Sequence, residues 1–162
     1  MTTRRVRKAT PDDCAALERI QGASPSAAQW PVAEYLAYSC AVVESDKTMG
    51  DSDEARAGLD EAPVAGFIVW RQAGPGENEI LNLAVDPGLR RKGMGRQLLK
   101  FALDSDYSSI WFLEVRESNQ AAISFYESYG FQIKGHRKLY YRDPVEAGIV
   151  MSFDSCYRHV AI

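Results

Sequence analysis

The chain has 162 residues, of which 46% are hydrophobic and 25% charged, and its formal net charge is −3. This length corresponds to one domain with a single core, and the slightly acidic balance argues against a nucleic-acid-binding protein. The sequence has no apolar run long enough to span a membrane and no signal peptide, and Cys14, Cys40 and Cys156 lack the spacing of a metal or redox site. We therefore expect a single domain over residues 1–162, located in the cytoplasm, with the cysteines as small core residues.

The first half of the chain is expected to alternate short strands and helices. Residues 4–8 form the first strand, and Thr10 and Pro11 then hold the positions of an N-cap and a first helical residue. That helix reaches about Gln21, and a loop containing Pro25 follows. Further along, the pattern predicts a short helix over residues 31–38 and strands over residues 39–44, 63–71 and 79–85.

Residues 46–61 interrupt this alternation with a strongly acidic stretch. It holds six acidic and two basic residues, a net charge of −4, together with Gly50 and Gly58 and little that could enter a core. We expect a flexible surface loop here. Its charge is explained either by solvation or by attraction to a basic partner.

The second half begins with a helix from about Gly93 to Ser105. Apolar side chains recur on one face of it, at Met94, Leu98, Phe101 and Ala102. The nearly unbroken apolar run SIWFLEV predicts a strand that is buried on both faces. SNQAAISFYESYGF predicts a further helix that ends at Gly130, and its expected inward stripe is Ala122, Phe125, Tyr126 and Tyr129. Strands over residues 131–138 and 148–154 complete a mixed α/β order.

The stretch DPGLRRKGMGRQLLK places glycines and basic residues at the start of the helix near Gly93. A helix N-terminus presents unpaired N–H groups and partial positive charge, and glycines let an anion approach the backbone, so the stretch predicts a phosphate site. Met94 and Gly95 stand where a nucleoside-triphosphate loop needs lysine and serine or threonine, and Leu98 stands where a dinucleotide fingerprint needs glycine. What remains is Arg-x-x-Gly-x-Gly, beginning at Arg90, for which a solvated basic turn is the alternative.

Arg-x-x-Gly-x-Gly between a strand and an amphipathic helix resembles the acetyl-coenzyme A motif of the GCN5-related N-acetyltransferases (GNAT), and LNLAVD resembles the central strand of that family. The resemblance implies a mixed, mostly antiparallel sheet of six to seven strands, splayed at the central strands, with about four flanking helices. It implies acetyl-coenzyme A as the acetyl donor and no metal. The implied donor contacts are Leu83, Ala84, Val85, Arg90, Arg91, Lys92, Gly93, Met94, Gly95 and Arg96.

A narrower resemblance covers residues 79–153. LEVRESNQAAISFYESYGF, HRKLYY and GIVMSF are similar to segments of the bacterial ribosomal-protein-alanine N-acetyltransferases. This resemblance implies Glu114 as the general base and Tyr126 as both the general acid and a cofactor contact, with Asn119 on the cofactor arm. The residues also allow plainer roles: an ion pair with Arg116 or another cation for Glu114, a core position for Tyr126, and a helix cap for Asn119.

The same resemblance implies that the acceptor is the α-amino group of a protein N-terminus, such as that of a ribosomal protein. Tyr140 and Tyr141 would grip the first peptide units, with Glu146 in the next loop, although a hairpin aromatic pair is the plainer explanation. Two features depart from the family. Pro25 and Trp30 are separated by four residues instead of being adjacent, and Glu146 stands alone where two adjacent acids are usual.

The chemistry of the acceptor also favours a terminal amine. An α-amino group has a pKa of about 7.7–8.0 and a lysine about 10.4, so at pH 7 roughly a tenth of the first but about 0.04% of the second is neutral. Glutamate with its ordinary pKa of about 4.3 is a weak base for this step. We therefore expect the pKa of Glu114 to be raised by desolvation, or the residue to act through water.

Three other functions stay open. They are acetylation of a small-molecule amine or a protein lysine, a non-catalytic module that binds acetyl-coenzyme A, and nucleic-acid binding by the basic turn. Glu114 together with Tyr126 argues against the second, and the overall charge argues against the third. The expected partners are therefore acetyl-coenzyme A and a protein N-terminus, with no direct nucleic-acid or membrane binding.

Overall fold

The computed structural model describes residues 4–46 and 63–155. The strands are β1 (Val6–Lys8), β2 (Ser39–Glu44), β3 (Val64–Gly74), β4 (Glu77–Val85), β5 (Ile110–Arg116), β6 (Gln132–Arg142) and β7 (Val145–Asp154). The helices of the described residues are α1 (Cys14–Gly22), α2 (Val32–Tyr35), α3 (Met94–Asp104) and α4 (Gln120–Tyr129). One seven-stranded sheet has the order β1-β2-β3-β4-β5-β7-β6. All neighbours are antiparallel except β4 and β5, which confirms the predicted fold class.

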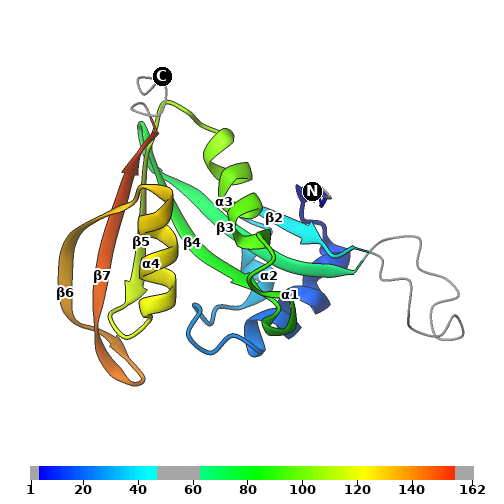
Figure 1. Ribbon diagram of the computed structural model, residues 1–162, viewed down its shortest axis with the longest axis horizontal. Helices are drawn as coiled ribbons and strands as arrows, with labels where there is room; N and C mark the ends of the chain where they lie inside the picture. The colour runs from blue at the N-terminus through cyan, green and yellow to red at the C-terminus, as the bar shows by residue number, and fades with distance from the viewer. Residues whose placement is uncertain (1–3, 47–62, 156–162) are drawn as a thin grey trace, which may run out of the picture.

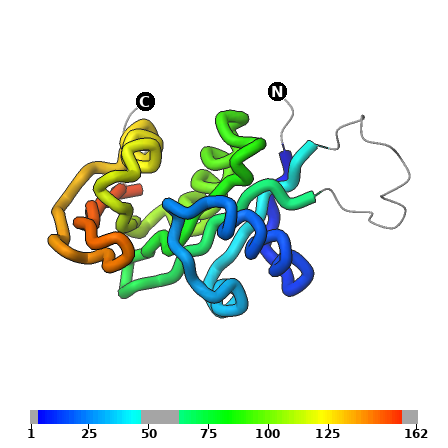
Figure 2. The backbone as a smooth tube through the Cα atoms, turned by 90° about the horizontal axis from the view of Figure 1, so that it is seen from below, coloured from blue at the N-terminus to red at the C-terminus, as the bar shows by residue number. Residues whose placement is uncertain are grey.

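The helices lie in two layers on opposite faces of the sheet (Figures 1 and 2). On one face, α3 and α4 cover a core that contains Leu98 and Trp111. On the other, α1 and α2 cover a second core that contains Leu17 and Phe67. Because α1 packs on β3 and β4, the second layer stops before it reaches β5.

The expected periodicity of α3 is confirmed, whereas α4 buries Tyr126 together with Ile123, and the other residues of its predicted stripe, Ala122, Phe125 and Tyr129, are half-buried. Met94, Leu98 and Ala102 are buried under α3. The helix α4 ends at Gly130, whose φ of +104° is a left-handed conformation that favours glycine. The two helices therefore cover the same face of the sheet with residues of one core.

The expectation that β5 is buried on both faces is wrong. Trp111 and Leu113 are buried, but Ile110 is 38% exposed and Phe112 is only half-buried. Trp111 and Leu113 belong to the core that α3 and α4 cover, whereas α1 packs chiefly on β3 and β4. The apolar run therefore predicted the strand correctly, but the prediction that both of its faces are buried was wrong.

Several elements differ in length from the prediction. The helix expected over residues 31–38 is a single turn, Val32–Tyr35. The last two strands are longer, because β6 and β7 stay paired to Arg142 and Val145, across a bulge where Leu139 has a φ of +54°. The acidic segment lies outside the described residues except for its first residue, and Cys156 also lies outside them. Cys40 is buried as expected, and burial raises the pKa of its thiol to about 12.

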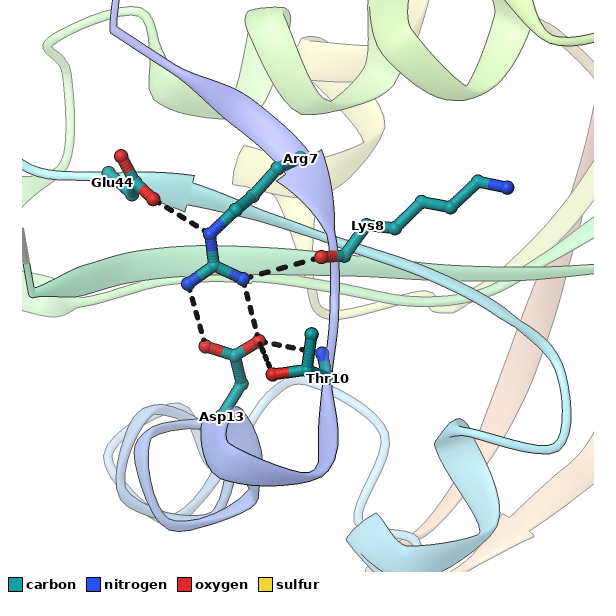
Figure 3. Close-up of polar contacts among 5 residues, drawn as sticks. All are labelled: Arg7, Lys8, Thr10, Asp13 and Glu44. Carbon is teal, nitrogen blue, oxygen red and sulfur yellow. Dashed lines mark hydrogen bonds and ion pairs between the residues drawn. The ribbon is translucent and has the colours of Figure 1, made fainter. Parts of the chain in front are cut away.

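A buried ion cluster fastens the N-terminal strand to the rest of the fold (Figure 3). The Arg7 guanidinium donates two hydrogen bonds to Asp13, at 2.8 and 2.9 Å, and one to Glu44 at 2.7 Å. The Asp13 carboxylate also accepts from the backbone N–H of Thr10 at 2.8 Å, which closes the first helical turn. The cluster joins β1, β2 and the start of α1.

Candidate active site

Pairing between the two central strands stops half-way along β4. The parallel ladder runs from Glu77 opposite Ile110 to Ile80 opposite Leu113, and no later pair across this gap is recorded in the described part of the chain. Each strand keeps its outer neighbour, since β4 pairs with β3 up to Val85 and β5 pairs with β7 along its whole length. The strands therefore diverge (Figure 1), which confirms the predicted splay.

The opening between the two strands is a cleft of about 440 Å³. Its walls come from β4, β5, α4, the β6–β7 hairpin and the segment between α1 and α2. Five of the residues singled out from the sequence line it, namely Leu83, Glu114, Asn119, Tyr126 and Tyr141. The fold therefore brings the proposed base, acid and cofactor contacts into one space.

The unpaired edge of β4 turns backbone groups toward this cleft. The N–H of Asp86 donates to the carbonyl oxygen of Ala65 on β3 at 2.8 Å. Antiparallel strands alternate the direction of successive residues, so Ala84 also faces β3 while Leu83 and Val85 face away from it. The Leu83 and Val85 backbone groups are thus available on the cleft side, although the Val85 carbonyl already accepts from Arg90 at 3.1 Å.

The segment Arg-x-x-Gly-x-Gly, residues 90–95, is called the glycine loop, and two of its residues have left-handed backbone conformations where it enters α3. Gly93 has a φ of +81° and Arg91 a φ of +61°. The opening turn of α3 leaves N–H groups without an acceptor inside the helix, and such groups together with the helix dipole favour anions, so the phosphate site stays a prediction. A Cβ atom at Gly95 would lie 3.5 Å from the Phe125 ring and 3.8 Å from Leu83, so this end of the helix adjoins the cleft.

The basic side chains of the loop do not all point alike. Arg91, Lys92 and Arg96 are exposed around the helix N-terminus. The Arg90 guanidinium is instead directed back to the scaffold, where it donates to Val85 O at 3.1 Å and to Ser24 Oγ at 3.0 Å. As a diphosphate contact, Arg90 stays a prediction, and these bonds show what its side chain touches.

Glu114 is the first residue of β5 beyond its pairing with β4. Its Oε1 forms an ion pair with Arg137 Nη1 at 3.1 Å, and its Oε2 is buried without a hydrogen-bond partner. An unpaired buried carboxylate oxygen is costly, and such groups in native proteins call for an explanation. The cation expected from the sequence as a structural partner exists, but it is Arg137 on β6 and it satisfies only one of the two oxygens.

Tyr126 is 5% exposed and reaches the cleft from α4. Its ring packs edge-on between Phe125 and Phe131, at centroid distances of 5.1 and 5.4 Å. Burial raises the pKa of its phenol, so the group stays protonated at neutral pH. Asn119 caps the same helix, because its Oδ1 accepts from the N–H of Ala122 at 3.1 Å, and it also lines the cleft.

Tyr140 and Tyr141 pack at right angles, with ring centroids 5.0 Å apart. Tyr141 lines the cleft and burial raises the pKa of its phenol to about 12. Tyr140 is 46% exposed and lies over Gly148, where a Cβ atom would come within 3.1 Å of its ring. The expected pair therefore has one member inside the cleft and one member at its rim.

Glu146 fastens the β6–β7 hairpin to the end of β5. One carboxylate oxygen is 3.4 Å from Arg116 Nη1, and the other accepts from the N–H of Ser118. Arg116 also donates to the carbonyl of Asp143 at 2.9 Å and lies 4.3 Å from the centroid of the Tyr141 ring. Both oxygens of Glu146 are therefore engaged within the protein.

A buried polar cluster beneath the cleft was not anticipated from the sequence. Asn82 Nδ2 donates to Ala28 O and to Tyr35 Oη, both at 2.9 Å. Gln21 Nε2 donates to Trp30 O at 2.8 Å, and Gln21 Oε1 accepts from Tyr35. These residues lie up to 61 positions apart, so no local pattern could have grouped them.

The described ranges contain neither a metal-binding cluster nor a membrane-spanning helix. No group of three or more histidine, cysteine, aspartate or glutamate side chains there is placed to hold a metal ion. None of the helices in those ranges is both long and apolar enough to cross a membrane.

Comparison with known proteins gives consistent matches. Residues 51–133 match the family model described as the acetyltransferase (GNAT) domain. The chain is 40% identical over 88 residues to the N-alpha-acetyltransferase RimI of Mycobacterium tuberculosis, covering 54% of this chain and 56% of that protein. It is 43% identical over 82 residues to the ribosomal protein bS18-alanine N-acetyltransferase of Escherichia coli, covering 47% and 55%. The aligned region is thus about half the length of these curated relatives.

The likeness to a solved structure extends further along the chain. The crystal structure of the ribosomal-protein-S18-alanine N-acetyltransferase from Escherichia coli has a TM-score of 0.71 and 26% identity, covering 93% of both chains. The family model covers half of this chain, including the glycine loop and both diverging strands. The protein therefore belongs to the GNAT acetyltransferase family.

Proposed function

We propose that this protein transfers the acetyl group of acetyl-coenzyme A to the free α-amino group of a peptide or protein N-terminus. One observation carries the proposal. One cleft contains an unpaired strand edge and a buried carboxylate oxygen that has no partner, and the N-terminus of α3 adjoins it where Gly95 lies next to Leu83. The helix N-terminus would bind the diphosphate of the donor, the strand edge would bind the thioester carbonyl, and the carboxylate would bind the amine.

Donor binding would begin at the start of α3. The N–H groups of the opening turn, with the helix dipole, hold the diphosphate of coenzyme A, and the exposed Arg91 and Arg96 add positive charge. Gly95 lets the diphosphate lie close to the backbone beside Leu83. From there the pantetheine arm can enter the gap between β4 and β5, where β4 offers free backbone groups instead of a neighbouring strand.

The thioester carbonyl would accept a hydrogen bond from the cleft-facing N–H groups of Leu83 or Val85. When the amine attacks, the carbonyl oxygen gains negative charge, and fixed backbone donors stabilise that charge without having to reorganise. The divergence of β4 from β5 would thus have a function, because the N–H groups of a fully paired strand would already be bonded to its neighbour.

Glu114 would take the proton of the amine. Its Oε2 is the buried acceptor without a partner, while Arg137 holds Oε1 and so fixes the orientation of the carboxylate. The substrate ammonium supplies the missing hydrogen bond, loses its proton to Glu114 directly or through water, and attacks the carbonyl carbon. A new C–N bond forms and the C–S bond breaks.

Tyr126 would donate the proton that the departing thiolate needs. It lies in the cleft on α4, and its raised pKa keeps the phenol protonated until the sulfur develops charge. A thiol has a pKa of about 8.5, below that of a phenol, so the proton moves to the sulfur only as the C–S bond breaks, and the phenolate then takes a proton from water.

A terminal amine is the acceptor that the site supports best. Its lower pKa leaves it more than a hundredfold richer in the neutral form than lysine at pH 7. Tyr141 inside the cleft and Tyr140 at its rim can flank the first peptide units. The names of the relatives add support for an alanine terminus of a ribosomal protein.

The test is a competition among acceptors. The protein is incubated with acetyl-coenzyme A and a pool of peptides with free N-termini, peptides whose only free amine is a lysine, and polyamines, and the acetylated products are identified by mass spectrometry. We expect α-amino products, with alanine-initiated peptides among the best, and their loss with Glu114→Gln. Products confined to lysine or polyamines would overturn the acceptor, and no release of thiol with any amine would overturn the activity.

A further inference from the structure

The segment between α1 and α2, residues 23–31, forms one wall of the cleft, and we call it the acceptor loop. Its residues from Pro25 to Trp30 line the cleft together with Glu114 and Tyr141. In Figure 1 it is the blue segment that reaches toward the open side between β4 and β5. No regular secondary structure holds most of this loop, so its shape depends on side-chain contacts.

Three side chains from outside the acceptor loop hold it along its length. Arg90 donates to Ser24 Oγ at 3.0 Å, Asn82 donates to Ala28 O at 2.9 Å, and Gln21 donates to Trp30 O at 2.8 Å. The loop is thereby fixed near its start, in its middle and near its end. Two of the three side chains belong to the proposed donor site, since Asn82 is on β4 and Arg90 is in the glycine loop.

The contact through Asn82 is the most constrained of the three. Asn82, Gln21 and Tyr35 are 5%, 8% and 0% exposed. Buried amides are tolerated because they are hydrogen-bonded, and here the loop carbonyls supply part of those bonds. If the acceptor loop shifted, Asn82 would lose the Ala28 carbonyl and Gln21 would lose the Trp30 carbonyl as buried acceptors. The loop is therefore restricted to one position relative to β4.

Asn82 is also next in sequence to Leu83, whose backbone faces the cleft. Its side chain extends to the acceptor loop, while the adjacent Leu83 backbone would hold the acetyl carbonyl. Two consecutive residues of β4 would thus fix the distance between the substrates, Asn82 through the acceptor loop and Leu83 through the acetyl carbonyl.

From this arrangement we infer that Asn82 is a positioning residue that sets the acceptor site by holding the acceptor loop through the carbonyl of Ala28. The inference rests on the proposed function for the identity of the two substrates. It makes acceptor recognition depend on Asn82 and leaves donor recognition to the backbone of β4 and the start of α3.

The experiment compares the two Michaelis constants. Asn82→Asp and Gln21→Glu keep the shape of the side chain but replace its NH₂ donors with oxygen, so that the carbonyls of Ala28 and Trp30 face an acceptor. With an alanine-initiated hexapeptide as the probe, we expect the KM for peptide to rise about tenfold, as for the loss of one buried hydrogen bond. The KM for acetyl-coenzyme A should stay within about twofold, a small change on the same scale.

A matched control is Arg19→Gln. Arg19 also ties α1 to the end of β4, through Asp86 at 2.5 Å, but it is half-exposed and does not line the cleft. Both Michaelis constants should be unchanged in this variant. An unchanged KM for peptide in Asn82→Asp, or an equal rise of both constants, would overturn the inference, because a merely structural role predicts no such separation.

A second measurement separates this inference from the proposed function. Amide hydrogen exchange in residues 24–31 should be faster in Asn82→Asp than in the unaltered protein, with the dissociation constant for coenzyme A preserved. If Asn82→Asp does not fold, Asn82→Ser serves instead, since its side chain is uncharged and too short to reach the Ala28 carbonyl. If the hexapeptide is not acetylated although coenzyme A binds, the acceptor assignment fails, and exchange rates unaltered by these substitutions would overturn the positioning role.

Discussion

The two walls of the cleft are built in different ways. The donor wall, β4 with the glycine loop and α3, consists of backbone groups presented by regular elements. The acceptor wall, formed by residues 23–31 and the β6–β7 hairpin, is held by side chains such as Asn82 and Arg116 that reach across the fold. A site made from backbone leaves a short local motif in the sequence, whereas a site made from distant side chains leaves none.

Glu114 lies between the two walls, and its substitution should have the largest effect. Glu114→Gln removes the proton acceptor and preserves the shape of the side chain, so turnover should fall about a hundredfold or more while coenzyme A binds as before. Steady-state kinetics with a calorimetric titration check both parts. Glu117→Gln is the matched control, since Glu117 is exposed three residues further on, and a Glu114→Gln variant as active as this control would contradict the assignment.

Tyr126 should show a somewhat smaller effect of the same kind. Tyr126→Phe keeps the packing between Phe125 and Phe131 but removes the proton donor, so we expect a loss of turnover of about a hundredfold with little change in either Michaelis constant. Tyr129→Phe on the same helix is the comparison and should keep nearly full turnover. Equal rates for the two variants would reduce Tyr126 to a core residue.

Substitution of Gly93 should affect the donor wall and leave the acceptor wall unchanged. Its φ of +81° is strained for any residue with a Cβ atom, although the space around it is open. Gly93→Ala therefore costs about 1–2 kcal/mol in local conformation and should weaken coenzyme A binding about tenfold in a calorimetric titration, without changing the KM for peptide. Gly22→Ala also meets open space, at ordinary backbone angles, and should bind coenzyme A normally. Normal binding by Gly93→Ala would show that the turn does not shape the site.

Asp13 belongs to neither wall, so its substitution should change stability and leave the chemistry intact. Asp13→Asn removes the carboxylate that pairs with both terminal nitrogens of Arg7 in Figure 3, while Glu44 stays paired with Arg7, and the variant should lose about 2–4 kcal/mol of unfolding free energy at pH 7. Chemical denaturation measures this loss, with the exposed Asp12→Asn as the control. The Michaelis constants should not move.

The same cluster predicts a pH dependence. Burial by itself raises the pKa of Asp13, but the hydrogen bonds from Arg7 and from the Thr10 N–H outweigh it, so the folded-state pKa lies below the usual value. The stabilisation is therefore complete above the unfolded-state pKa of about 3.9 and is lost as the pH falls through the lower folded-state value. Asp13→Asn should flatten this acid limb of the stability curve, and an unchanged limb would contradict the role of the cluster.

Features governed by local chemistry were predictable. Gly93 and Gly130 mark a left-handed turn and a helix end, and the apolar spacing of α3 and α4 indicates their buried faces. Features governed by distant partners were not. The burial of Ile110 depends on how far the α1 layer extends, and the direction of Arg90 depends on Ser24, 66 positions away. Glu114 was expected to act as a base or to pair with a cation, but nothing local pointed to Arg137.

The most direct test of the central claim is a crystal structure of the protein with coenzyme A. We expect the diphosphate to lie against the N–H groups at the start of α3, near Gly93 and Gly95, and the thiol to lie between β4 and β5 within reach of Tyr126. Coenzyme A bound outside the cleft, or held there with its diphosphate away from this helix end, would contradict the proposed site and the mechanism built on it.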